Sequence, residues 1–187
     1  MRSGRTWLLA LIALALAACA TPSAPPERTY SGRFSATALD GGRQNNSVSG
    51  RFTVEVRGNR QLIDLATPVG TTVARIEIEP GRAQATGPQL QTVTGPDADE
   101  LVERLLGWRL PVTGLADWLE GRPEPTRPAR TQMSGERLGT IEQDGWTIHI
   151  DEYSTATNKP RRLSLERPMT GREPAVSVRL IVDDPVG

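Results

Sequence analysis

Apolar and polar residues alternate along several segments of the chain, and a period of two is typical of strands with one buried and one exposed face. In the first clear segment, Phe52, Val54 and Val56 alternate with polar residues. Pairs such as Gly58-Asn59 and Pro80-Gly81 predict tight turns. The predicted strands are residues 52–57, 62–65, 74–79, 146–150, 163–166 and 176–182, with weaker candidates at 83–85 and 89–93.

A helical pattern interrupts these strands in the middle of the chain. In residues 97–106 the apolar positions fall on one side of a helix, and acidic residues occupy its first turn. A shorter helix is predicted over residues 112–120, and the prolines of residues 122–128 predict an extended segment. The order of strands, helices and strands predicts an antiparallel sheet, open or partly closed as a barrel, with helices across its mouth.

The N-terminus has the pattern of a cleavable signal. Arg2 and Arg5 precede an apolar run that is too short to cross a bilayer comfortably, and the run ends at Leu16-Ala17-Ala18-Cys19. This is a lipobox, in which the cysteine becomes the site of acylation. We therefore predict a signal peptide over residues 1–18 and a lipid anchor on Cys19, in preference to a free thiol. An Ala after the cysteine, where Asp would favour inner-membrane retention, favours the outer membrane.

Residues 19–28 are rich in proline and poor in apolar side chains, which predicts a flexible tether. Residues 29–187 are long enough for one domain with a single core. Without Arg2 and Arg5, the balance of 22 basic and 22 acidic residues becomes two charges negative. A basic surface for nucleic acid is therefore not expected, and we predict no nucleic-acid partner.

Candidate catalytic residues are few. His149 is the only histidine, and the strand pattern places it on an exposed face. Glu120 and Glu124 are a conceivable acid and base pair, but both lie beside prolines in a predicted loop. No nucleophile elbow, phosphate-binding loop or zinc motif is present in the sequence. We therefore expect no enzymatic activity, no metal and no cofactor, although a hydrolase that uses these three residues is a rival hypothesis.

Three segments of the sequence form one pattern: residues 67–72 (Thr-Pro-Val-Gly-Thr-Thr), residues 105–123 with their Gly-Trp, Leu-Pro and Trp-Leu-x-Gly-x-Pro elements, and residues 143–146 (Gln-Asp-Gly-Trp). Together they resemble the LolB family, the outer-membrane receptors for lipoproteins. The resemblance covers nearly all of the chain after Cys19. It implies a mainly β fold: an unclosed antiparallel barrel with a helical lid over an apolar cavity for acyl chains.

The resemblance also implies function and partners. Such a receptor accepts lipoprotein cargo from the periplasmic carrier LolA and releases it into the outer membrane, and we expect it to act as a monomer facing the periplasm. Members of the family present an exposed apolar residue, commonly Leu, on a loop between two strands. Pro68, Val69 and Gly70 match that loop, so Val69 is the predicted membrane-transfer residue. A Val at this position is smaller than the usual Leu.

The lining of the cavity is predicted from the strand alternation and the helix faces. The alternative function is a lipid-anchored module that binds a small hydrophobic ligand. An apolar interior face has the same sequence pattern in such a module and in a lipoprotein receptor. The predicted lining and lid residues are Phe52, Val54, Ile76, Ile78, Leu101, Leu105, Leu115, Trp118, Trp146 and Ile148.

Overall fold

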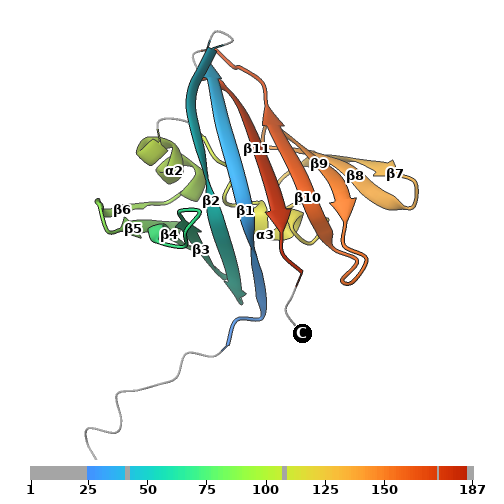
Figure 1. The fold of residues 1–187 in the computed structure, drawn as a ribbon, viewed down its shortest axis with the longest axis horizontal. Helices are drawn as coiled ribbons and strands as arrows, with labels where there is room; N and C mark the ends of the chain where they lie inside the picture. Colours follow the sequence, from blue (N-terminus) through green and yellow to red (C-terminus); the bar gives the residue numbers. More distant parts are fainter. Residues whose placement is uncertain (1–24, 41–42, 107–108, 172, 185–187) are drawn as a thin grey trace, which may run out of the picture.

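The computed structural model describes residues 25–40, 43–106, 109–171 and 173–184, and in this part of the chain eleven strands form one sheet. The sheet is antiparallel throughout and follows the order β6-β5-β4-β3-β2-β1-β11-β10-β9-β8-β7, so its two end strands do not pair with each other (Figure 1). The strands are β1 (Arg28–Asp40), β2 (Arg43–Arg57), β3 (Arg60–Ala66), β4 (Thr72–Glu79), β5 (Arg82–Gly87), β6 (Leu90–Gly95), β7 (Ala129–Ser134), β8 (Arg137–Gln143), β9 (Trp146–Tyr153), β10 (Pro160–Arg167) and β11 (Ala175–Val182). The predicted unclosed antiparallel sheet is confirmed.

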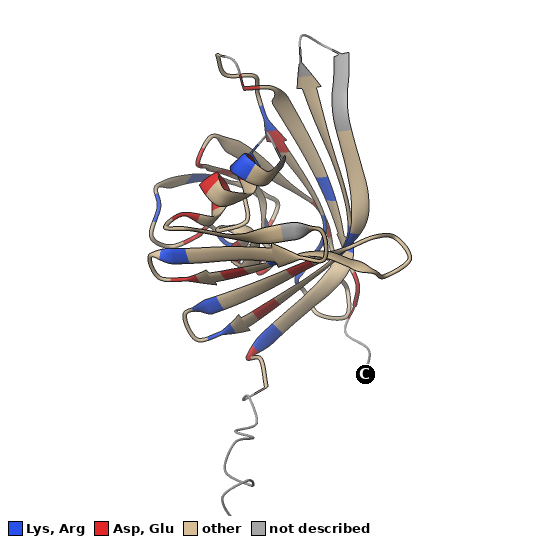
Figure 2. Ribbon diagram, turned by 90° about the vertical axis from the view of Figure 1, so that its left-hand side faces the viewer, with Lys and Arg blue, Asp and Glu red and all other residues tan. Residues whose placement is uncertain are grey.

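Alternation of side chains gives the sheet an apolar face and a charged face. Phe52, Val54 and Val56 of β2 are buried on the inner face, as predicted. On the outer face, Arg75 of β4 donates two hydrogen bonds to the Asp64 carboxylate of β3 in a bidentate arrangement, with both N–O distances at 2.7 Å. Figure 2 shows such blue and red segments interspersed along neighbouring strands. One face is therefore built for water and the other for apolar contact.

Three strands were not predicted. β1 lies at the centre of the sheet between β2 and β11, although its inward positions include Gly32 and the small Ala36 and Ala38. β7 and β8 form a hairpin at one end, and all six residues of β7 are exposed. Neither segment has the strong apolar alternation that reveals a strand in a sequence. The predicted tether also overlaps the sheet by one residue, because Arg28 begins β1.

Two helices cover the inner face of the sheet (Figure 1). α2 (Ala98–Leu106) agrees with the prediction, and the Asp97 carboxylate caps it by accepting a hydrogen bond from Glu100 N at 2.9 Å. α3 (Leu115–Trp118) is shorter than the predicted helix over residues 112–120. Residues 122–128 form no strand or helix, as predicted.

The inner face and the two helices share one apolar core. The fully buried members include Ile63 of β3, Leu101 of α2, Leu119 beside α3 and Leu163 of β10. Every strand, and every described member of this core, lies within residues 28–182, so that segment carries a complete sheet and core. Among the described residues, no helix is long and apolar enough to span a bilayer.

Candidate lipid-binding site

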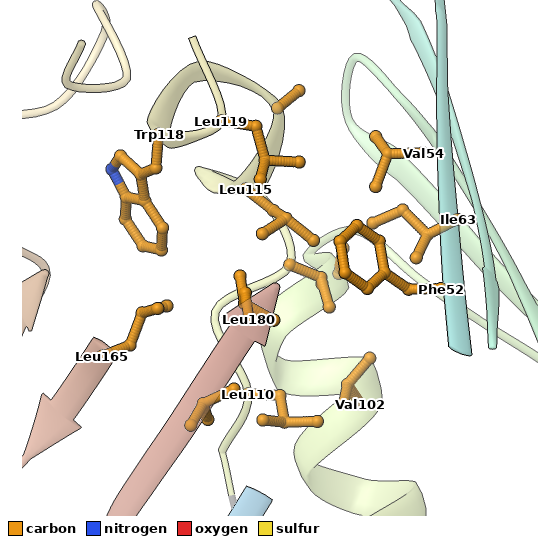
Figure 3. Close-up of a cluster of buried hydrophobic side chains, with 14 of the residues drawn as sticks. Phe52, Val54, Ile63, Val102, Leu110, Leu115, Trp118, Leu119, Leu165 and Leu180 are labelled. Carbon is orange, nitrogen blue, oxygen red and sulfur yellow. The ribbon is translucent and has the colours of Figure 1, made fainter. Parts of the chain in front are cut away.

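The predicted lining and lid residues come together between the sheet and the helices. Eight of them are buried and belong to one cluster, and Ile78 and Leu105 are partly buried against it. Figure 3 shows Leu115 of α3, and Leu119 directly after this helix, pointing toward Phe52, Val54 and Ile63 of the sheet. The sequence therefore identified a group of residues that share one place in the fold.

These side chains form a packed core in this structure. A side chain that borders a space large enough for water keeps some accessible surface, yet Val54, Leu101 and Ile148 keep none. The side chains of the two helices thus pack directly against the sheet, and we call this packed arrangement the closed form.

Asp99 fastens the start of α2 to the segment that follows it. The Asp99 Oδ1 atom accepts hydrogen bonds from Val112 N at 2.8 Å, from Thr113 N at 2.9 Å and from Thr113 Oγ1 at 3.1 Å. These backbone groups lie just before α3, which begins at Leu115. Asp99 is buried, so these bonds compensate for much of the cost of taking a carboxylate out of water.

Arg127 links the lid to the turn between β8 and β9. Its Nη1 atom lies 2.9 Å from Asp144 Oδ2 and 3.5 Å from Asp99 Oδ2, and its Nη2 atom lies 3.7 Å from Asp97 Oδ2. The hydrogen bond to Asp144, together with the charges of the three carboxylates, raises the pKa of Arg127 above its ordinary value. The lid is therefore attached to the sheet at this point by polar contacts that water can replace.

Gln143, at the end of β8, is a second attachment point. Its Oε1 atom accepts hydrogen bonds from Trp118 Nε1 and Glu124 N, both at 2.9 Å. Its Nε2 atom donates to Glu124 O at 2.8 Å and to Arg127 O at 3.1 Å. Gln143 therefore holds α3 and the proline-rich segment against the sheet. Gln143 lies in segment 143–146, which resembles the LolB family. Its role as an attachment point is evident only from its burial in the structure.

The loop between β3 and β4 presents Val69 to solvent. Val69 is 89% exposed, and Pro68 and Gly70 are exposed beside it. Hydrogen bonds from Gly70 N to Thr67 O and from Thr67 N to Thr71 O, both 2.9 Å, close the loop. Gly70 has a φ of 94°, a conformation that favours glycine. The loop is thus built to hold an apolar side chain away from the protein.

A pocket lies where β1, β10 and β11 meet the end of α3, and we call it the end pocket. Its apolar wall includes Tyr30, Leu119, Pro160 and Val182. Lys159 contributes to its rim, and the Lys159 Nζ atom lies 2.9 Å from Glu120 Oε1. Nothing in the sequence pattern pointed to this pocket, because its residues come from distant segments.

The other candidates have structural surroundings of their own. His149 is half-buried on the outer face of β9, with its Nδ1 atom 3.3 Å from Thr140 Oγ1. Glu120 pairs with Lys159, whereas Glu124 accepts hydrogen bonds from Thr126 N and Thr126 Oγ1. The predicted signal peptide and Cys19 lie outside the described residues, and so do Gly107 and Trp108 of the family-like block.

Comparison with known proteins identifies the family of this chain. The family model described as "Outer membrane lipoprotein LolB" matches residues 27–184. The outer-membrane lipoprotein LolB of Cupriavidus pinatubonensis is 39% identical over 200 residues, which cover 97% of this chain and 95% of that protein. LolB of Bordetella petrii is 37% identical over 190 residues, which cover 97% of this chain and 93% of the relative.

Among solved structures, a LolA superfamily protein from Nitrosomonas europaea matches with a TM-score of 0.47 and 11% identity, over 85% of this chain and 86% of that one. The sequence matches are much stronger, and they include nearly the whole described domain. By its sequence, this chain belongs to the LolB family of outer-membrane lipoproteins.

Proposed function

We propose that this protein is a lipoprotein receptor, which accepts acylated proteins from a LolA-type periplasmic carrier and inserts them into the outer membrane. The observation that carries the proposal is the apolar inner face of the sheet, which is covered only by two short helices and their connecting segments. The protein is anchored through Cys19, faces the periplasm and acts as a monomer without enzymatic activity.

The physical problem for such a receptor is the exposure of acyl chains to water. Each methylene group costs about 0.8 kcal/mol when it leaves an apolar environment. A site between the sheet and the lid offers the chains Phe52, Ile76 and Trp146 as apolar contacts. The site must still bind the chains less favourably than a bilayer does, since otherwise release would stop.

The packed core helps to meet this requirement. Leu101, Leu115 and Trp118 are buried in the core between lid and sheet, so cargo must displace them. When cargo leaves, these side chains return to the core and recover their own apolar contacts. The closed form therefore competes with bound acyl chains, which favours delivery without a nucleotide or other energy source.

Val69 gives the receptor a point of contact with the membrane. Its exposed side chain lies on the closed loop between β3 and β4, where it enters the interfacial region without any change in the fold. Val is smaller than the Leu that is common in the family, so the contact is shallow. We assign Pro68, Val69 and Gly70 to the transfer of cargo into lipid.

A transfer assay tests the receptor role. The chain without its first 19 residues, which keeps the complete sheet and core, is mixed with a LolA-type carrier loaded with an acylated lipoprotein. Co-purification of cargo with the chain is the expected result. A folded chain that takes no cargo from the carrier would contradict the proposal and favour a binding module for a small hydrophobic ligand.

Two variants separate acceptance from delivery. Val69→Glu is expected to accept cargo normally but to deliver less of it to liposomes, because a charge on the loop opposes entry into lipid. Met133→Glu is the matched control, since Met133 of β7 is also an exposed apolar residue, at 64%. Equal delivery by both variants would remove the assignment of Val69.

A further inference from the structure

The two tyrosine hydroxyls of the protein differ in their hydrogen bonding. Tyr153 Oη donates a hydrogen bond to Leu138 O at 2.7 Å. Tyr30 is only 7% exposed, and its buried hydroxyl has no hydrogen-bond partner among the described residues. A buried hydroxyl without a partner destabilises a fold, and most such groups are paired. The unpaired hydroxyl of Tyr30 therefore calls for an explanation.

Tyr30 lies at the boundary between the core and the end pocket. Its side chain belongs to the apolar cluster, and it also forms part of the pocket wall beside Leu119. The Lys159 Nζ atom lies 5.5 Å from the centre of the Tyr30 ring, at the polar rim. From the core outward, the order is thus the apolar cluster, Tyr30 and a charged rim.

An acylated lipid has the same order of groups: hydrocarbon chains, ester carbonyls and a polar head. An ester carbonyl is a hydrogen-bond acceptor, and the Tyr30 hydroxyl is a donor. We propose that the Tyr30 hydroxyl donates a hydrogen bond to an ester carbonyl of the bound acyl-glyceryl group, with the head group in the end pocket. This inference rests on the proposed receptor function, and it deepens that function by assigning a polar contact to the acyl site.

The Tyr30 hydroxyl forms this hydrogen bond only when cargo is bound. In the closed form the hydroxyl has no partner, and a carbonyl supplies one when acyl chains enter. Phospholipids carry the same ester group, so the chemistry alone does not separate them from a lipoprotein. We assign the lipoprotein as the occupant. The receptor would take phospholipid from the same membrane into which it releases it, so binding phospholipid would give no net transfer.

The test compares Tyr30→Phe with the matched variant Tyr153→Phe. Both variants lack one hydroxyl and keep the ring. Each protein, as the chain without its first 19 residues, is mixed with a LolA-type carrier loaded with one labelled ligand: a diacylglyceryl-cysteine peptide, its dialkyl-ether analogue or a diacyl phosphatidylglycerol. The ligand that co-purifies with each protein, after its separation from the carrier, is then measured.

We expect wild type to take up the ester peptide about two- to tenfold better than the ether peptide, and Tyr30→Phe to lose this preference. Tyr153→Phe is expected to keep it. A Tyr30→Phe variant that still prefers the ester would overturn the inference and leave the receptor function intact. A wild-type protein that takes none of the ligands from the carrier would contradict the receptor function itself. Dependence on Tyr30 for phosphatidylglycerol alone would overturn the assignment to lipoprotein.

Thermal unfolding provides a second readout. The midpoint of Tyr30→Phe should be equal to that of wild type or higher by about 2–4 °C, because the variant removes an unpaired buried hydroxyl. The midpoint of Tyr153→Phe should be lower, because that variant loses a hydrogen bond. A clearly lower midpoint for Tyr30→Phe would show that the hydroxyl already has a partner in the empty protein, and would overturn the inference.

Discussion

Replacement of Gln143 by Leu should destabilise the protein by removing the attachment of α3 to the sheet. Gln143 is 3% exposed and makes four hydrogen bonds, and a leucine of similar size makes none of them. The Trp118 Nε1 donor would be left buried without a partner, which costs about 1–3 kcal/mol. The other groups lie nearer to solvent and add less. We expect a total loss of about 3–5 kcal/mol in the free energy of unfolding.

Urea unfolding followed by circular dichroism measures this loss. Gln132→Leu is the matched control, because Gln132 lies on the exposed strand β7 and its replacement should change stability by less than about 0.5 kcal/mol. Adding Trp118→Phe to Gln143→Leu removes the orphaned indole donor, so the effects of the two changes should not add. A loss below about 1 kcal/mol for Gln143→Leu would refute the role of Gln143 as an attachment point.

Three further predictions concern the loop, the centre of the sheet and alkaline pH. Val69→Leu adds one methylene, worth about 0.8 kcal/mol, and should increase binding to liposomes about fourfold in a flotation assay; unchanged binding would argue against insertion. Gly32→Ala would place a Cβ 2.1 Å from Ile181 O and should cost about 2 kcal/mol or more in urea unfolding, so wild-type stability would be a contrary result. Burial raises the pKa of Tyr153 above its ordinary value of 10.0, so the unfolded chain loses this proton first as pH rises. The part of the free energy of unfolding that depends on neutral Tyr153 is fully present below pH 10.0 and declines above it. As the pH is raised above 10.0, the thermal midpoint of Tyr153→Phe should therefore fall less than that of wild type.

The strands that the sequence revealed are those with large apolar residues on one face only. β2, β4 and β9 have this pattern, and their predicted lining residues are buried except Ile78 of β4, which is partly buried. β1 was missed because the small residues Gly32, Ala36 and Ala38 interrupt and extend the inner face that also carries Tyr30 and Phe34. A Cβ on Gly32 would clash with the backbone of β11, so a larger residue does not fit there. The pattern of hydrophobicity does not report such steric limits.

Other differences have equally local causes. β7 has no buried face, so the pairing with β8 that forms it leaves no trace in the apolar pattern. The second helix has only four residues, Leu115–Trp118, although the apolar pattern extends over residues 112–120. The unpaired Tyr30 hydroxyl depends on how distant segments pack, and a sequence pattern does not contain this information.

The position of β1 has a consequence for how the protein is made. β1 pairs with β11, so the first and last strands of the chain lie side by side at the centre of the sheet. Contacts between such distant segments form slowly and require the whole chain. The two halves, β2–β6 and β7–β10, are joined only when the C-terminal strand reaches β1. A nascent chain that is still emerging at its C-terminal end therefore has no continuous inner face, and the apolar face of the sheet becomes continuous only once β11 has paired with β1.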